Sequence, residues 1–419
     1  MSSKYQVVNG KIKSPLCGSF AELRSGNAQL RRACRWLLFF VFTFTFSLSF
    51  ASPQLSEKSF ISLLTCSPGK ELYSAFGHSA IRVADPENGI DRTYNYGTFD
   101  FDQPDFYSNY AKGRPLFMLS VASTRNFLGA YVYENRSVQE DILNLSQEQK
   151  QRMFELLEEN YLPENRNYRY DYIYDNCATR IRDLILSVAD NKIIFDTFPA
   201  PPASTFRELM RLYLQPQPWG AFGIDLALSS VIDTPAPPYY RMFLPDYLQK
   251  GFEHARFSEG NPPAAVVKSS RVFYTAEPDA PEKIFFTPLV ICCSLFFIFL
   301  LKTTVDFRKQ KISFIALDIL LFAVIGIVGV LIAYISFFSD HHAARNYNLL
   351  WAVPAHLPAA LLLPFSRRFT WVKKYFLLAV ILAAIAFIGG FTILPQKFNA
   401  AFYPVMLTIG MRGWMIWKK

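Results

Sequence analysis

The sequence predicts an α+β domain outside the membrane, followed by an all-α membrane domain of five transmembrane helices. Between residues 53 and 283, short stretches of alternating apolar residues are mixed with amphipathic helical patterns. From residue 284 onward, long apolar segments follow one another at 284–301, 312–338, 346–365, 375–394 and 398–417. Each has about the ~20 residues that a helix needs to cross the hydrocarbon core. We therefore expect three parts, with bounds 1–52, 53–283 and 284–419.

The first 52 residues resemble an export leader. Seven basic side chains precede an apolar stretch that runs from Trp36 to Phe50. The sequence Ser49-Phe50-Ala51 then offers small residues suitable for signal cleavage. The pattern predicts either a cleaved signal peptide or a retained signal anchor, and in both cases the domain that follows is exported.

Charged residues orient the five apolar segments. Basic residues concentrate on alternate connections and at the C-terminus, namely Lys302, Arg308, Lys309 and Lys311, then Arg367, Arg368, Lys373 and Lys374, and finally Lys418 and Lys419. Because basic loops stay in the cytoplasm, the chain enters its first span from the outer side. The preceding domain is therefore predicted to be periplasmic or extracellular.

The net charge of +9 is a consequence of this topology. The segments 1–52 and 284–419 hold 20 of the 43 basic side chains and only 4 of the 34 acidic ones. Residues 53–283 therefore carry 23 basic and 30 acidic side chains, a balance of −7. An acidic exported domain gives no support for nucleic-acid binding.

The first half of the exported domain is predicted to contain a sheet. Strands are expected at 80–83 and 94–99, joined by a turn through 85–89, with further strands at 117–121 and 139–145. Ser146 then caps a helix in which Gln149 completes a capping box, and Met153 and Leu157 lie on its apolar face.

The segment 168–174 is expected to be extended backbone leading into a further helix. Past residue 196, prolines divide the chain, and a short helix is predicted near 206–214. Pro216, Pro218, Pro235, Pro237 and Pro238 are interpreted as breaking the remainder into loops.

Cys177 is the leading candidate for a reactive residue. It follows Asp175 and Asn176, both good helix-capping residues, and it opens an amphipathic run that contains Ile181 and Leu184. At a helix N-terminus, the macrodipole and the unpaired amides favour a thiolate. Cys177 also lies on the apolar stripe of the helix, so a small buried core residue is the alternative interpretation.

His78 is the candidate partner for this thiol. In an alternating strand His78, Ala80 and Arg82 share one face, while the opposite, more apolar face packs on the core. We therefore expect His78 to point toward a groove lined by Arg82. A purely structural strand histidine is the alternative. The other histidine of the exported domain, His254, is expected at a helix end.

The six cysteines allow a competing interpretation. Only Cys66 and Cys177 lie in the exported domain, and two cysteines in an oxidising compartment ordinarily form one disulfide. The sequence shows no CxxC motif, no Cys/His metal spacing, no phosphate-binding glycine loop and no nucleotide motif. We therefore expect neither a metal nor another cofactor.

Three sequence blocks together resemble one bacterial envelope family. They read Phe76-Gly77-His78-Ser79, Tyr94-Asn95-Tyr96-Gly97-Thr98-Phe99-Asp100-Phe101 and Tyr174-Asp175-Asn176-Cys177-Ala178-Thr179-Arg180. Two weaker similarities follow at 243–248 and 342–350. The pattern resembles the family of the Bacteroides-type lipoprotein N-acyltransferase, Lnb.

The resemblance implies a permuted papain-like periplasmic domain, in which the histidine strand precedes the cysteine helix. Cys177 would be the nucleophile and His78 its base. Asn95 would orient the imidazole, with Tyr94 and Tyr96 as competitors for that role.

The resemblance also implies an activity in the bacterial inner membrane. A fatty acyl chain would move from a phospholipid, through a thioester on Cys177, to the α-amine of the diacylglyceryl-cysteine of a lipoprotein. Substrate binding is expected from a set of polar residues around this site and on the outer face of the membrane domain: Arg82, Tyr96, Asn176, His342 and Asn346. Asn176 would help the nearby backbone amides to stabilise the oxyanion.

Two other functions remain compatible with the sequence. One is a periplasmic cysteine hydrolase of peptidoglycan or lipid esters that uses the same two residues. The other is a non-enzymatic envelope receptor or assembly protein in which Cys66 and Cys177 form a structural disulfide.

Overall fold

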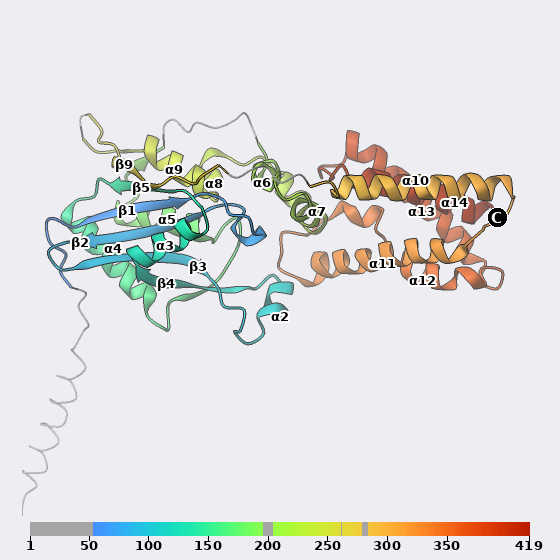
Figure 1. The fold of residues 1–419 in the computed structure, drawn as a ribbon, viewed down its shortest axis with the longest axis horizontal. Coiled ribbons are helices and arrows are strands. Elements are labelled where there is room, and N and C mark those ends of the chain that lie inside the picture. Colours follow the sequence, from blue (N-terminus) through green and yellow to red (C-terminus); the bar gives the residue numbers. More distant parts are fainter. Residues whose placement is uncertain (1–52, 196–203, 261, 279–283) are drawn as a thin grey trace, which may run out of the picture. The chain divides into compact units, whose positions relative to one another are not determined.

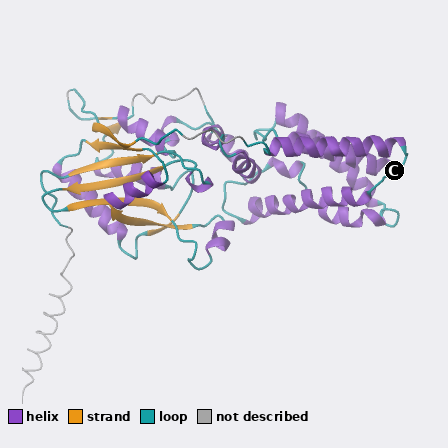
Figure 2. Ribbon diagram, in the orientation of Figure 1, coloured by secondary structure: helices purple, strands orange, loops and turns teal. Residues whose placement is uncertain are grey.

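The computed structural model describes residues 53–195, 204–260, 262–278 and 284–419 (Figures 1 and 2). Residues Gln54–Lys419 form one compact unit. The predicted leader of residues 1–52 lies outside the described residues.

A seven-stranded antiparallel sheet organises the first part of the chain. Its strands lie in the order β6-β4-β3-β2-β1-β5-β9. Their bounds are β1 Phe60–Cys66, β2 His78–Asp85, β3 Ile90–Thr98, β4 Leu116–Ser123, β5 Val138–Leu143, β6 Asn167–Arg169 and β9 Val267–Tyr274. A separate pair is formed by β7 Ile193–Ile194 and β8 Arg256–Phe257.

The predicted hairpin between β2 and β3 is present. Asp85 ends β2, and its carboxylate accepts hydrogen bonds from the side chain of Asn88 at 2.8 Å and from the amide of Ser56 at 2.7 Å. Gly89, at φ +65°, supplies the left-handed residue that returns the chain into β3.

Different helices cover the two faces of the sheet. Ile81, Val83 and Tyr94 belong to the main hydrophobic core, which also includes residues of the helices α4 Gln147–Tyr161, α5 Cys177–Val188 and α9 Pro245–His254. On the other face, Ala80 packs with Phe127 of α3, Thr124–Tyr133 (Figure 1). The capping box predicted for the helix after Ser146 forms as expected at the start of α4.

The structure corrects the prediction for the proline-rich segment. Pro218, Pro238 and Pro245 each occupy the first turn of a helix, where a missing N–H costs nothing. The helices here are α6 Phe206–Leu214, α7 Pro218–Ala227, α8 Pro238–Arg241 and α9. The prediction of an extended 168–174 segment was also wrong beyond β6, because an isolated bridge between Asp171 and Asp175 closes a turn there.

The C-terminal part is helical. Three of its helices are long and apolar enough to cross a membrane: α10 Pro288–Arg308, α11 Ile315–Phe338 and α13 Trp371–Thr392. The last predicted segment forms α14, Phe402–Lys418, which has 17 residues. The third, 346–365, is broken into the short helix α12 His356–Leu362 and flanking 3-10 turns, because Pro354 lacks the N–H that a continuous helix requires.

A buried ion cluster joins three of these helices. Arg412 binds Asp318 at 2.7 Å and Asp306 at 2.8 Å, and Lys302 lies 2.8 Å from both carboxylates. Two positive and two negative charges thus compensate one another where unpaired charge would be costly. Asp318 therefore has a structural role in this cluster.

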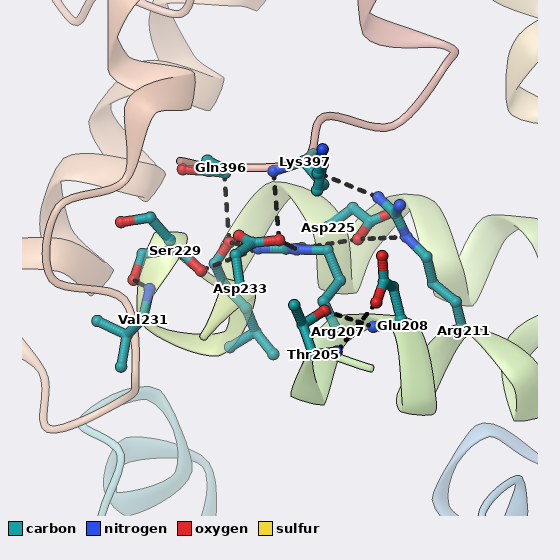
Figure 3. A network of polar contacts seen from close by, with 12 residues as sticks. Thr205, Arg207, Glu208, Arg211, Asp225, Ser229, Val231, Asp233, Gln396 and Lys397 are labelled. Carbon is teal, nitrogen blue, oxygen red and sulfur yellow. Dashed lines mark hydrogen bonds and ion pairs between the residues drawn. The ribbon is translucent and has the colours of Figure 1, made fainter. Parts of the chain in front are cut away.

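A second polar network lies where α6 and α7 meet the chain before α14 (Figure 3). Arg207 and Asp225 are both almost fully buried and pair at 2.7 Å, and Arg207 also binds Asp233 at 2.8 Å. Arg211 links Asp225 to the backbone carbonyl of Lys397 at 3.0 Å. These bonds fasten the segment after the sheet to the membrane helices.

Candidate active site

Asn176 fixes the start of the helix that presents Cys177. Its side-chain oxygen accepts hydrogen bonds from the amides of Ala178 at 2.9 Å and Thr179 at 3.0 Å, and the backbone amide of Asn176 donates to the Thr179 hydroxyl at 2.8 Å. The amide of Cys177 itself has no acceptor within the part of the chain that the structure describes. One backbone donor beside the sulfur is therefore available.

His78 and Asn95 form the second half of the arrangement. Nε2 of His78 donates to Oδ1 of Asn95 across 2.5 Å, which leaves Nδ1 of the imidazole for the thiol. Ile81 of β2 and Tyr94 of β3 point into the main core on the face covered by α5. Side chains alternate along a strand, so His78 on β2 and Asn95 on β3 lie on the opposite face. Cys177 still contacts His78, because it is the first residue of α5 and lies beside the ends of β2 and β3.

The electrostatics favour an ion pair between these side chains. Burial alone would raise the pKa of the Cys177 thiol, but the charge and hydrogen bond of His78, with the amides of Ser79 and Ala178, lower it below its ordinary value. Burial alone would lower the pKa of His78, and the Cys177 thiolate with Asn95 raises it instead. Both shifts favour a thiolate beside an imidazolium over a neutral pair of side chains.

Gly97 lies directly beside this contact. A methyl group on Gly97 would lie 3.6 Å from Cβ of Cys177 and 3.8 Å from Cε1 of His78. The backbone has φ +93° at this point, and the pairing of β3 with β4 shifts between Tyr96 and Thr98. Glycine permits this irregular strand end at the candidate site. A lone glycine in a strand pattern was the sequence signal for it.

Tyr168 is a further polar residue that sequence reasoning missed. Its hydroxyl is buried without a hydrogen-bond partner and lies 4.0 Å from the same methyl position on Gly97. The Arg180 guanidinium stacks over its ring at 3.6 Å, and Asp175 holds that guanidinium through two hydrogen bonds. Burial and the nearby Cys177 thiolate raise the pKa of Tyr168, so the hydroxyl keeps its proton.

Arg82 and Tyr96 do not join the candidate site. Arg82 binds Asp91 at 2.7 Å and Glu140 at 2.9 Å, four strand residues, or roughly 13 Å, from His78. Tyr96 is only 2% exposed and accepts a hydrogen bond from Asn160 within the main core. The expected groove lined by Arg82 was therefore wrong, because this side chain belongs to an ion network on the sheet face.

Two predicted substrate-binding residues have structural roles. The amide nitrogen of Asn176 donates to the carbonyls of Tyr172 and Phe243, both at 2.9 Å, so it has no free donor for an oxyanion. Asn346 is buried, and its amide nitrogen donates to the carbonyls of Leu226 and Ala227. Neither side chain points into open space.

His342 contacts the chain that leads to Cys177. It belongs to residues 339–346, here called the outer loop, which follow α11. Nε2 of His342 lies 2.7 Å from Asp171, and its ring packs edge-on against Tyr172 and Tyr174. Burial tends to raise the pKa of Asp171, but the bond to His342 lowers it. His342 thus holds the segment before the nucleophile.

Cys66 and Cys177 are both free thiols. Cys66 packs with Ala80 and Phe127, and burial raises its pKa to about 12. A disulfide between the two cysteines is therefore not part of this structure, and Cys66 remains a protonated core residue. No cluster of metal-ligating side chains occurs among the residues that the structure describes.

Two family models match the chain in succession. The Lnb N-terminal periplasmic domain matches residues 52–211, and the Lnb transmembrane domain matches residues 280–419. Both models come from one family and together cover most of the chain. The chain belongs to the Lnb family. Searches of curated proteins and of solved structures gave no significant match.

The Lnb models agree with the coarse organisation read from the sequence, a periplasmic α/β part followed by a helical membrane part. Cys177, His78 and Asn95 all fall within the periplasmic match. The name of the second model denotes five transmembrane helices, of which α10, α11 and α13 meet the length and composition expected of a span.

Proposed function

We propose that this Lnb-family protein is a lipoprotein N-acyltransferase of the inner membrane with its catalytic domain in the periplasm. The observation that carries the proposal is the contact of Cys177, at a capped helix start, with an imidazole held by Asn95. The order of histidine strand and cysteine helix is that of a permuted papain-like domain. The proposed bounds are 53–283 for this domain and 284–419 for a membrane domain of five spans.

Acylation of Cys177 is the first half of the reaction. The thiolate attacks the carbonyl carbon of a phospholipid fatty ester and forms a tetrahedral oxyanion. When the carbon–oxygen bond breaks, the imidazolium of His78 donates its proton to the departing lysophospholipid oxygen. The products are a thioester on Cys177 and a neutral imidazole.

Transfer to the amine completes the cycle. The α-amine of the diacylglyceryl-cysteine attacks the thioester carbonyl, and His78 accepts a proton from the attacking nitrogen. Collapse of the intermediate forms the amide and releases the Cys177 thiolate. The imidazolium–thiolate pair is thereby restored, and no cofactor is consumed because the ester supplies an already activated acyl group.

Two donors support stabilisation of the oxyanion. The amide of Cys177 has no acceptor in the described chain, and the Tyr168 hydroxyl is buried, unpartnered and adjacent to the reactive pair. We assign these two groups to the oxyanion in place of Asn176, whose amide nitrogen is already bonded to two carbonyls. Preorganised donors of this kind contribute most where water is excluded.

Mass spectrometry of lipoprotein N-termini tests the proposal directly. Cells that lack conventional N-acylation would express the wild-type chain, Cys177→Ala or Cys66→Ala. We expect an added acyl chain with the wild type and with Cys66→Ala, because Cys66 is a core thiol, and none with Cys177→Ala. An equal gain from Cys177→Ala refutes a nucleophilic Cys177.

The same experiment separates the competing functions. Release of free fatty acid with no acylated N-terminus identifies a hydrolase that uses the same residues. If neither product depends on Cys177, the non-enzymatic interpretation is favoured. The outer loop supports the transferase, because it fastens the domain that carries Cys177 to the membrane domain, where both lipid substrates reside.

A further inference from the structure

An exposed group of aromatic rings surrounds α2, Phe106–Ala111. Phe101, Tyr107 and Tyr110 are 55%, 73% and 55% exposed, and we call them the α2 aromatic surface. Their rings contact the buried Phe106 at centroid distances of 5.2, 5.3 and 6.1 Å. Exposed aromatic residues that scatter singly need no explanation, but rings that join into one surface indicate a binding site.

The inner end of this surface approaches the candidate nucleophile. Phe101 contacts Phe99 at 4.9 Å, and Phe99 contacts Phe117 at 5.0 Å. Phe117 stacks on Tyr170 at 4.2 Å. Phe117, Tyr170 and Cys177 all pack against the main hydrophobic core, so the last ring of the series and the sulfur belong to one packed region. Burial and the charge of the Cys177 thiolate both raise the pKa of Tyr170.

The outer end is fastened to the membrane domain. The carbonyl of Tyr110 lies 2.9 Å from Nε2 of His341, and the carbonyl of Lys112 accepts from the Asp340 amide at 2.9 Å. A methyl group on Gly113 would lie 2.5 Å from the His341 amide, so the two backbones are in close contact. The outer loop begins directly after α11, a candidate span that ends at Phe338.

Two salt bridges support this attachment. Arg114 and Arg169 bind the same carboxylate of Asp340 at 2.8 and 2.5 Å, and they lower its pKa. The α2 aromatic surface therefore lies at the end of a span, where aromatic side chains characteristically meet the lipid–water interface.

We propose that the α2 aromatic surface binds the acyl chains of a bilayer phospholipid and guides the scissile ester to Cys177. The inference rests on the proposed acyl transfer, because it assigns the place where the donor lipid lies. A lipid is favoured over a protein partner because the rings form a continuous series from the membrane domain to the neighbourhood of the sulfur.

Photo-crosslinking tests the position of the lipid without requiring catalysis. Full-length Cys177→Ala would be reconstituted into phosphatidylcholine vesicles that contain a phosphatidylcholine with a diazirine in its acyl chain. After irradiation, mass spectrometry maps the attached lipid. We expect labelling of residues 99–110 well above that around Tyr133, which is 92% exposed but outside the α2 aromatic surface. Labelling no greater than at Tyr133 overturns the inference.

Substitutions provide the second measurement. Phe101→Ser combined with Tyr107→Ser should reduce this labelling and raise KM for a long-chain phospholipid donor on the order of tenfold, because apolar contact area is lost. Tyr133→Ser removes a more exposed ring outside the α2 aromatic surface and should change neither the labelling nor KM. The alkylation rate of Cys177 in the double variant should match the wild type, which excludes misfolding as the cause.

The outcomes distinguish this inference from the proposed function. Labelling of residues 99–110 without any acyl transfer would leave the lipid site standing and refute the transferase. Normal acyl transfer by the Phe101/Tyr107 double variant, with wild-type KM and labelling, would refute the lipid site and leave the transferase intact. Capture of a protein in place of lipid at this surface would also refute it.

Discussion

Replacing His78 with alanine should convert Cys177 from a thiolate into an ordinary buried thiol. In the wild type, the charge and hydrogen bond of His78 are the main forces that overcome burial and lower the thiol pKa. Without the imidazole, burial again dominates, and we expect the pKa to reach at least the ordinary value of 9.0. At pH 7 a thiol of that pKa is only about 1% ionised.

The expected magnitude follows from that ionised fraction. A hundredfold smaller thiolate population is partly offset because a more basic thiolate is the better nucleophile. We therefore expect His78→Ala to slow iodoacetamide alkylation at pH 7 by about tenfold or more. The loss should disappear at high pH, where both proteins are thiolates.

The pH dependence gives the sharpest measurement. Because the pKa of Cys177 is lowered and that of His78 is raised, alkylation of the wild type should depend less steeply on pH than alkylation of His78→Ala. In His78→Ala the rate should rise about tenfold per pH unit up to pH 9. Peptide mapping of the full-length protein follows Cys177 separately from the other cysteines.

Two comparisons make the result decisive. His254→Ala removes an exposed histidine at the end of α9 and should reproduce the wild-type profile. The alkylation profile of Asn95→Ala should lie between those of the wild type and His78→Ala, because this change releases the imidazole without removing its charge. A wild-type profile from His78→Ala would refute the electrostatic account of this site.

Three further variants test the surrounding structure. Asn176→Ala removes a helix cap and leaves two buried carbonyls without donors, so we expect about 3 kcal/mol lower stability in denaturant unfolding; an unchanged midpoint would contradict this. Tyr168→Phe should slow acyl transfer about a hundredfold while alkylation of the nucleophile stays normal, whereas Tyr172→Phe, which removes another buried, unpartnered hydroxyl, should slow neither. Gly113→Ala should push the outer loop away and increase hydrogen exchange in α2, whereas Gly129→Ala, with open space around it, should not; equal exchange in both would refute the close contact.

Local patterns predicted many of the elements correctly. Ser146 with Gln149 is a capping box that depends on residues three apart, and it forms at the start of α4. The β2–β3 hairpin follows from alternation and a turn. The strand β1 was missed because its residues are buried on both faces, so FISLLTC has no alternation to recognise. The strand β9 pairs with β5 more than a hundred residues earlier, a partner that no local pattern reveals.

The sequence predicted some residues of the candidate site correctly and others incorrectly. Cys177, His78 and Asn95 meet as the family resemblance implied, although His78 and Asn95 lie on the sheet face opposite α5. Arg82 shares the strand face of His78 but is held by carboxylates on neighbouring strands. Tyr168 was missed because its unpartnered hydroxyl becomes evident only when the surrounding chain is in place.

The sequence by itself determined the order of the parts and the capped helix that presents Cys177, and it predicts the orientation of the membrane segments. These depend on hydrophobic length, charge placement and hydrogen bonds between near neighbours. Tertiary packing decided which polar side chains meet. A strand advances about 3.3 Å per residue, so Arg82 lies far from His78 although the two residues share a face. The first residue of α5, Cys177, can contact His78 on the opposite face because it lies where β2 begins and β3 ends.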